Sequence, residues 1–473
     1  MSDPKIFVLL LFYTAYIKAQ RTAVIGHQGP LHSWPLITRK KVIPKAPMDS
    51  VTTLINSFKA QNVTIKRWAG RGFWAVMDQG LFATSNLILN ILLARWITPA
   101  EYGAFTVSYT IFLLLGTFHT ALITEPMLVF GSGKYKDCFF QYLRVLLRGH
   151  CLFTTIVGAL SATAALVFAV TTRSHLTPAL FGPSIAGPFI LFQWLMRRAC
   201  YVNMQPQFAA YSGAVYMVLM LLGAYGLYRF AWLGSATVLG IMALSSLASG
   251  IWLVKKLTPI QESRYSGTLQ KDLWQDHWKY GKWALGTAML TWIPGNINYL
   301  LLPIWGNLQD AGAYRALLNL FLPVTHITTA LGGLLIPTFV SARDSEKFSK
   351  LICRSFILFI ITPTIYWLIL GLTAELLIQF LYVGRYVEFS ELLWIAGLIP
   401  IVAAVVAVSG AVLRALEWPN KVFIAYACST ATMLTIGVGL VIMLGVRGAI
   451  IGWFLSYAVT GAVLLSMAVF RQH

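Results

Sequence analysis

Apolar runs of about 20 residues recur along the chain from position 74 to position 470. A helix of this length crosses a hydrocarbon core of about 30 Å. A membrane β-barrel would instead alternate apolar and polar residues over segments of about ten, and that pattern is absent from this sequence. We therefore predict an all-α polytopic membrane protein with twelve spans, at 74–97, 105–130, 146–170, 184–200, 208–228, 235–254, 283–305, 313–340, 352–372, 390–412, 422–444 and 448–470.

The distribution of charge agrees with this number of spans. Only 11% of the 473 residues are charged and 58% are hydrophobic, whereas a soluble domain has roughly a quarter of its residues charged. If residue 73 is cytoplasmic, 30 of the 36 Lys and Arg residues fall on the cytoplasmic side. Positive charge is retained on that side during insertion, so both termini are expected to be cytoplasmic. The net charge of +20 then reflects topology and attraction to anionic lipid, not nucleic acid.

An internal repeat divides the chain into two halves. A shift of 209 residues aligns GFWA (72–75) with GKWA (281–284), and it aligns Gly103-Ala104 with Gly312-Ala313. Six predicted spans separate the two copies, so both have the same orientation. We expect a first six-helix lobe at 71–255, a cytoplasmic linker at 256–282 and a second lobe at 283–473, related by a pseudo-twofold axis along the membrane normal. Such repeats are typical of transporters with the substrate path between the halves.

The first 70 residues are expected to form a poorly ordered cytoplasmic extension. Their one apolar run, 6–17, is too short to span a membrane and lacks a clear cleavage site for a signal peptide. An alternative is that translation starts at Met48. The five cysteines are scattered without metal-ligand or disulfide spacing, so we predict neither a metal site nor a cofactor.

Polar residues interrupt the first span along one helical stripe. The stripe contains Asp78, Gln79, Asn86 and Asn90. One interpretation is structural: Asp78 reaches the interface and the amides bond to neighbouring helices. The functional interpretation is that the stripe faces a water-filled cavity, where polar groups cost less free energy.

The seventh span carries a related irregularity. Asn86 corresponds in the repeat to Gly295, and Pro294-Gly295 predicts a break near mid-membrane beside Asn296 and Asn298. Irregular backbone at this depth is tolerated inside protein or along a cavity. We therefore expect a gate or substrate site there, with a plain proline kink as the alternative.

Four further residues are candidates for the cavity. His119 and His326 lie near the middle of the second and eighth spans, where they are either core residues, phosphate donors or proton carriers. Glu125, before Pro126, is either a carboxylate at the interface or a gate or coupling residue. Arg315 begins the eighth span on the outer side, against the inside bias, and is a candidate for binding a head group or phosphate.

Enzymatic activity is not expected. The chain contains no GxSxG or HExxH motif, and LVFGSGKYKD (128–137) lacks the glycine and the Ser or Thr that a Walker motif requires. A glycan polymerase or ligase would need a large outer loop, and no predicted outer connection exceeds about 20 residues.

The segment DQGLFATSNLILNILLARWITPAEYGAFTVSYT (78–110) resembles the opening of O-antigen and teichoic-acid exporters. These polysaccharide-export flippases belong to the multidrug/oligosaccharidyl-lipid/polysaccharide exporter superfamily. RRACYVNMQP (197–206) is similar to the family's short Arg-rich fourth-to-fifth connection. The resemblance covers about residues 70–470 in architecture and is detailed over 72–130 and 195–206.

The resemblance implies a MATE-like, two-lobed transporter in the bacterial cytoplasmic membrane. Its expected substrate is an undecaprenyl-pyrophosphate-linked oligosaccharide, moved outward by alternating access. Expected partners are membrane lipids, H+ or Na+ as coupling ion, and a polysaccharide polymerase with chain-length proteins. The chain departs from the family pattern because no Arg or Lys lies mid-membrane, so Arg315 or other arginines would have to hold the pyrophosphate. The alternative is a cation-coupled multidrug antiporter, with Asp78 and Glu125 as its ion-binding acids.

Overall fold

The computed structural model describes residues 49–171, 176–257, 268–343, 345 and 348–469, with side chains described from residue 70 in the first helix. The described chain is helical almost throughout. The first half contains α2 (Asp49–Trp96), α3 (Pro99–His119), the π-helix η1 (Thr120–Thr124), α4 (Glu125–Ser132), α5 (Phe139–Thr171), α6 (Leu176–Val202), α7 (Pro206–Arg229) and α8 (Ser235–Leu257).

The helix α9 (Thr268–Trp305) leads into the second half. That half contains α10 (Leu308–Asn319), α11 (Leu322–Gly332), α12 (Leu335–Ala342), α13 (Phe348–Leu372), α14 (Ala374–Tyr382), the 3-10 helix η2 (Val387–Phe389), α15 (Leu392–Ala396), α16 (Leu398–Ala415), α17 (Pro419–Thr432), the π-helix η3 (Met433–Gly437) and α18 (Val438–Val469).

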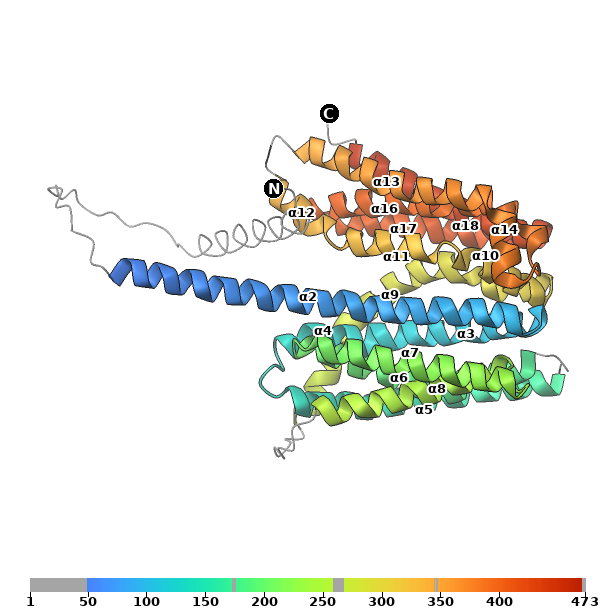
Figure 1. Cartoon of the computed structure of the whole chain (residues 1–473), viewed down its shortest axis with the longest axis horizontal. Coiled ribbons are helices and arrows are strands. Elements are labelled where there is room, and N and C mark those ends of the chain that lie inside the picture. The colour runs from blue at the N-terminus through green and yellow to red at the C-terminus, as the bar shows by residue number, and fades with distance from the viewer. Residues whose placement is uncertain (1–48, 172–175, 258–267, 344, 346–347, 470–473) are drawn as a thin grey trace.

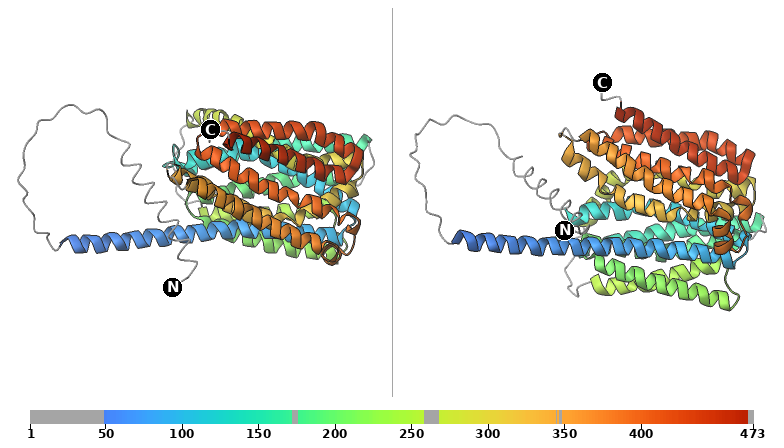
Figure 2. Two further views of the ribbon diagram at one scale, coloured as in Figure 1. Left: turned by 90° about the horizontal axis from the view of Figure 1, so that it is seen from above. Right: turned by 45° about the horizontal axis from the view of Figure 1, so that its top comes forward.

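The helices form two lobes whose axes run in nearly the same direction (Figures 1 and 2). In the first lobe α2 packs on α7, and α6 packs on α5 and α8; in the second, α16 and α17 pack on α18. We call the end that carries α4 and the start of α9 the α4 end, and the opposite one, where α3 meets α10, the α10 end. The predicted all-α, two-lobed fold is confirmed.

The membrane spans are consistent with the predicted twelve. Among the described residues, ten segments are long and apolar enough to cross a membrane. The last of them, Pro419–Ala468, contains Gly445 with φ 55° and ψ −128°, so it divides into two spans there. This division raises the number of spans from ten to eleven. The helix α9, which is not among the ten, is the twelfth.

Two predicted boundaries differ from the helix limits in the structure. Residues 1–48 lie outside the described residues, but 49–70 were expected to be poorly ordered and instead continue the first span as one helix, α2. No Pro or Gly lies between 49 and 69 to end it. Likewise, α9 begins at Thr268, so the later part of the expected 256–282 linker is helix continuous with the seventh span.

The predicted break at Pro294 was also wrong, because α9 runs through it. Proline has no N–H to donate to the carbonyl of Leu290, four residues earlier. The hydroxyl of Thr430 on α17 donates a hydrogen bond of 2.8 Å to that carbonyl. A neighbouring helix therefore satisfies the group that proline leaves free, which is how membrane helices tolerate proline.

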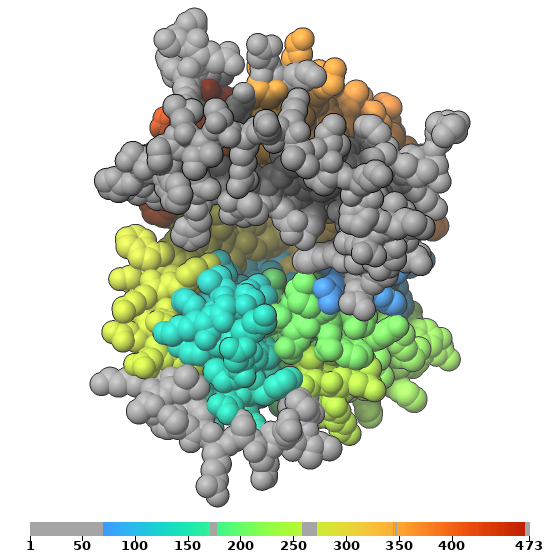
Figure 3. All heavy atoms as spheres, turned by 90° about the vertical axis from the view of Figure 1, so that its left-hand side faces the viewer, coloured from blue at the N-terminus to red at the C-terminus, as the bar shows by residue number. Residues whose placement is uncertain are grey.

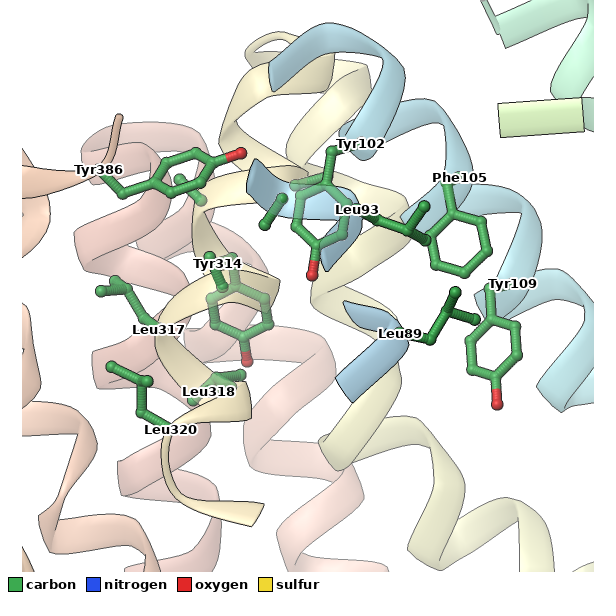
Figure 4. Close-up of a cluster of buried hydrophobic side chains, with 14 of the residues drawn as sticks. Leu89, Leu93, Tyr102, Phe105, Tyr109, Tyr314, Leu317, Leu318, Leu320 and Tyr386 are labelled. Carbon is green, nitrogen blue, oxygen red and sulfur yellow. The ribbon is translucent and has the colours of Figure 1, made fainter. Parts of the chain in front are cut away.

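The repeat places equivalent glycines against each other at the α10 end. A Cβ on Gly103 would lie 1.6 Å from the carbonyl oxygen of Leu308, and one on Gly312 would lie 3.1 Å from that of Pro99. Leu308 and Pro99 are themselves equivalent in the 209-residue shift. This reciprocal contact between α3 and α10 is what a pseudo-twofold axis between the lobes requires. Figure 4 shows the buried cluster around it, in which Tyr102 and Tyr314 come from the two helices.

Candidate functional site

A cavity of about 300 Å³ lies between the first lobe and α9. Its lining is mostly small and hydroxyl-bearing on the first-lobe side, and it includes two tryptophans. The lining residues are Leu113, Gly116 and Thr117 of α3, Thr120 and Ala121 of η1, Glu125 of α4, Trp194 of α6, and Ala288, Trp292 and Asn296 of α9. The structure thus brings together Glu125 and Asn296, two of the sequence-predicted residues. A cavity of this volume is at the lower end for a small-ligand pocket.

The π-helix η1 shapes the wall of this cavity. Single-turn π segments inside α-helices occur frequently at functional sites. The N–H of Glu125 bonds to the carbonyl of Thr120, which closes the wider turn. The Glu125 carboxylate is partly buried and accepts a hydrogen bond of 3.1 Å from the hydroxyl of Tyr280 on α9. The exposed Arg198 of α6 is close enough to Glu125 to interact with it electrostatically.

Asp78 does not face the cavity, contrary to the functional interpretation of its stripe. It is fully buried and forms an ion pair with Arg197 of α6, with Nη2 2.8 Å and Nε 3.2 Å from Oδ1. The hydroxyl of Tyr201 donates to Oδ2 at 2.6 Å. The guanidinium of Arg197 also lies over the ring of Phe82, 4.6 Å from its centroid. Gln79 is exposed beside this pair, and its amide nitrogen is 3.4 Å from Oδ2.

Asn90 and Arg315 join the two lobes near the α10 end. Arg315 on α10 donates from Nε to Oδ1 of Asn90 on α2 at 2.6 Å. Tyr102 donates to the same oxygen at 3.3 Å and accepts from the amide of Asn319 at 3.0 Å. We call these four residues the interlobe latch. Asn86, one turn before Asn90, is half-buried and bonds to the carbonyl of Phe82 in its own helix.

The Arg315 side chain lies in an aromatic enclosure. It is 7% exposed, and its guanidinium carbon is 4.7 Å from the ring centroid of Tyr109, 5.7 Å from Phe105 and 5.8 Å from Tyr299. None of the ion pairs among the described residues includes it. Aromatic faces stabilise a desolvated cation. The three rings therefore help to stabilise the buried guanidinium, which has no carboxylate partner within the described part of the chain.

Asn298 and the two predicted histidines do not line the cavity. Asn298 is buried and donates to the hydroxyl of Tyr314 at 3.2 Å and the carbonyl of Ala449 at 3.0 Å. His119 is fully buried, with Nε2 3.0 Å from Nδ1 of His150 on α5. Their cavity placement is therefore not supported. His326 is exposed on α11, which packs on α13 and α16.

Pro294 and Gly295 lie on α9 between Trp292 and Asn296, which line the cavity, but do not line it themselves. Pro294 is buried, and no atom lies within 4 Å of where a Cβ on Gly295 would be. Asn296 follows them and bonds through its amide to the carbonyl of Trp292, which also lines the cavity. The predicted gate residues are thus beside the cavity in an unbroken helix.

The start of α9 is held on the first lobe by polar contacts. His277 is buried; its Nδ1 is 3.0 Å from the carbonyl of Leu122, and its Nε2 is 2.6 Å from the hydroxyl of Tyr142. We call His277, Leu122 and Tyr142 the α9 anchor. Burial lowers the pKa of His277 below its usual value, so it is neutral at pH 7.

A second contact beside the α9 anchor is charged. Lys134 is 2.6 Å from Oδ2 of Asp276, and Tyr135 donates to the same oxygen at 2.8 Å. Burial disfavours ionisation of Asp276, but the hydrogen bonds from Lys134 and Tyr135 outweigh it and lower its pKa. Burial and the bond to Asp276 raise the pKa of Tyr135 to about 12. The start of α9 therefore belongs to the first lobe, while its far end packs on α10 and α18.

Sequence reasoning missed several residues of these sites. Arg197 and Tyr201 belong to the 197–206 segment but were not predicted as site residues, and neither was Tyr280. The recurrence of Thr120-Ala121-Leu122 in the repeat was a usable signal for the cavity wall. Within the described part of the chain, no group of three or more His, Cys, Asp or Glu side chains is arranged to hold a metal ion.

Two sequence comparisons bear on this architecture. A family model described as "Polysaccharide biosynthesis protein" matches residues 92–391. The succinoglycan biosynthesis transport protein ExoT of Rhizobium meliloti (strain 1021) is 25% identical over 292 residues. That alignment covers 60% of this chain and 56% of ExoT, so the chain matches only about half of the relative's length.

Solved structures share the fold at low sequence identity. An inward-facing multidrug resistance MATE family transporter of the MOP superfamily has a TM-score of 0.68 at 11% identity, covering 84% of this chain and 98% of that one. The lipid II flippase MurJ in an inward closed conformation also has a TM-score of 0.68, at 12% identity, covering 83% and 87%. At these sequence identities the similarity shows only that the proteins share a fold.

Proposed function

The chain belongs to the polysaccharide biosynthesis protein family, whose model spans residues 92–391, and from this premise we propose that it is a flippase for a lipid-linked oligosaccharide. It carries the substrate, an undecaprenyl-pyrophosphate-linked glycan, from the cytoplasmic to the outer leaflet by alternating access. The α4 end lies in the cytoplasm of a bacterial cell, because most Lys and Arg residues fall on that side. On the same ground both termini are proposed to be cytoplasmic.

The observation that carries the proposal is the cavity between the first lobe and α9. It lies between halves related by an internal repeat, where transporters of this kind bind substrate. Its lining residues include two with hydroxyl groups, one with a carboxylate and one with an amide: Thr117, Thr120, Glu125 and Asn296. Its 300 Å³ is too small for a lipid-linked oligosaccharide, so transport requires the lobes to separate.

The α10 end supports alternating access. There the lobes meet through the Gly103–Gly312 contact and the interlobe latch. Separation at this end would break the hydrogen bond between Arg315 and Asn90 and leave a cation without a partner. Arg315 would then be able to bind the pyrophosphate through charge-assisted hydrogen bonds. Arg198, exposed and near Glu125, is the second candidate for this role.

The second candidate function is a cation-coupled multidrug antiporter, in which Asp78 and Glu125 bind the ion. The fold likeness to the MATE transporter keeps it in consideration. The ion pair between Asp78 and Arg197 weighs against it, because the carboxylate already has a cation partner. Glu125 would then be the coupling group for H+ or Na+ in either function.

Deletion of the gene tests the proposal. We expect lipid-linked oligosaccharide to accumulate on the inner leaflet and surface polysaccharide to fall, with both restored by the intact gene. Normal surface glycan together with altered resistance to dyes or drugs would contradict the flippase and favour the antiporter. Neighbouring genes for a polymerase or chain-length protein would identify the partners.

A further inference from the structure

A second cavity, of about 530 Å³, lies at the α4 end of the first lobe. It is separate from the cavity against α9, since the two share no lining residue. Its walls come from the beginning of the α2 span and from the α6–α7 connection. Figure 3 views the molecule from this end, where the first described atoms of α2 (blue) lie beside those of the α6–α7 region (green). We call this cavity the α2–α7 pocket.

Two aromatic rings form one wall of the α2–α7 pocket. Trp74 and Tyr211 have their ring centroids 5.0 Å apart and their planes tilted by 55°. Tyr211 is 46% exposed, so part of its ring is open. A tilted pair of this kind presents two ring faces at an angle to whatever enters.

Three carboxamides supply the polar part of the lining. Asn203, Gln205 and Gln207 all line the pocket, and each side chain has both donors and an acceptor. The amide nitrogen of Asn203 is buried and makes no hydrogen bond to any of the described residues. The backbone there is fixed, because the N–H of Gln205 bonds to the carbonyl of Cys200 at 2.8 Å.

We propose that the α2–α7 pocket binds sugar residues of the lipid-linked substrate before transport. This rests on the proposed flippase function and names the part of the substrate that is recognised here. A pyranose has an apolar face of C–H groups, which suits the electron-rich face of an aromatic ring, and a rim of hydroxyls. Carboxamides donate to and accept from such hydroxyls. The rings and amides are uncharged, so they suit a polyhydroxyl group better than a phosphate.

The volume is consistent with this ligand class. Pockets of about 300–1,000 Å³ hold small organic ligands, lined by aromatic groups with a few placed polar ones. Arg71 also lines the pocket but is engaged with another group, so it does not define the ligand. The position at the α4 end, the proposed cytoplasmic side, is where a glycan assembled inside the cell would first meet the protein.

The internal repeat supplies a matched control. Trp283 is the equivalent of Trp74 in the 209-residue shift, but it is 73% exposed and lines neither cavity. A general need for tryptophan near the membrane interface would affect both positions alike. A sugar site at the α2–α7 pocket affects Trp74 alone. We therefore expect Trp74→Ala to lower surface polysaccharide at least fivefold, and Trp283→Ala to lower it less than twofold, at equal protein levels.

The direct test is photocrosslinking in the native host. A diazirine-bearing amino acid is placed at Tyr211, at Ala288 in the cavity against α9, or at Trp283, each in the full-length protein. After irradiation the protein is purified, and attached carbohydrate is detected by periodate oxidation and hydrazide labelling. Protein level and membrane insertion are measured for every variant, and only variants that insert normally are compared.

The three positions separate the possible outcomes. Carbohydrate attached at positions 211 and 288 but not at 283 supports the pocket. Carbohydrate at 288 and not at 211 overturns the pocket while leaving the flippase proposal intact. Carbohydrate at neither 211 nor 288 overturns both. Equal attachment at 211 and 283 also overturns the pocket, because it shows contact with glycan along the whole membrane surface.

Discussion

Several buried charged and amide side chains of this protein bond to residues on other helices. Asp78 pairs with Arg197, Asn90 with Arg315 and Asn298 with Tyr314. The sequence showed the polar stripe of α2, but the stripe looks the same whether it faces water or another helix. The partner of Asp78 lies 119 residues away, and periodicity within one helix carries no information about that distance.

The pair of Asp78 with Arg197 makes a prediction about stability. Removing one partner of a buried ion pair leaves an uncompensated charge and costs about 3–5 kcal/mol. We expect Asp78→Ala to lower the free energy of unfolding by this amount, measured by denaturant unfolding in detergent. The double variant Asp78→Ala with Arg197→Met should recover most of the loss.

Gln79→Ala is the control for that experiment, because Gln79 is exposed beside the pair. We expect it to change the free energy of unfolding by less than about 0.5 kcal/mol. A double variant no more stable than Asp78→Ala would show that the cost does not come from the unpaired arginine.

At the scale of elements, α9 is the helix that differs most from expectation. Pro294 and Gly295 predicted a break because local chemistry disfavours a helix there. The compensating hydroxyl of Thr430 lies on another helix, so the sequence alone did not reveal it. The apolar lengths of the other spans were sufficient to predict them, since each span depends mainly on its own composition.

The bond from Thr430 to Leu290 is testable by substitution. We expect Thr430→Val to lower the free energy of unfolding by about 0.6–1.7 kcal/mol, the range for interhelical hydrogen bonds in membranes. Thr432→Val is the matched control, because the Thr432 hydroxyl bonds to Cys428 in its own helix. Equal effects of the two substitutions would argue against a special role for the bond across helices.

The α9 anchor predicts a dependence on pH. The pKa of His277 is lower in the folded protein than in the unfolded chain, where it is about 6.5. The anchor is therefore fully present above about pH 6.5 and weakens as the pH falls toward the folded pKa. Protonation also removes the acceptor that His277 offers to Tyr142. Hydrogen exchange at 268–282 should accelerate from pH 7.5 to pH 5, after correction for the intrinsic rate.

His277→Gln is the control, since glutamine keeps a donor and an acceptor but does not titrate in this range. Its hydrogen exchange, corrected in the same way, should change little with pH. Equal acceleration in both proteins would assign the effect to other groups, such as Asp276.

At the scale of the whole molecule, the repeat was the most informative feature of the sequence. It predicted two lobes and the symmetry between them, and the reciprocal approach of Gly103 and Gly312 follows that symmetry. It did not predict that α9 would be anchored on the first lobe and packed on the second. That arrangement depends on contacts such as Tyr280 with Glu125, which have no counterpart in the repeat.

The close approach of α3 and α10 at Gly103 and Gly312 is expected to keep the lobes together at the α10 end. A Cβ on Gly103 would meet the carbonyl of Leu308 at 1.6 Å, so Gly103→Ala is incompatible with the closed arrangement. We expect this variant to favour separation of the lobes at the α10 end. Gly226→Ala on α7 is the control, because its added Cβ would meet no atom within 4 Å apart from its own stretch of helix backbone.

The central claim is that the cavity against α9 opens to one side of the membrane at a time. It is tested most directly by labelling Ala288→Cys, in a background with the native cysteines replaced by serine, with a membrane-impermeant thiol reagent. When Ala288→Cys is the only further change, and when Gly226→Ala is added to it, we predict labelling from the cytoplasmic side and at least tenfold less labelling from outside. In Gly103→Ala we predict that outside labelling rises and cytoplasmic labelling falls. Labelling from the same side in all three proteins would contradict alternating access through this cavity.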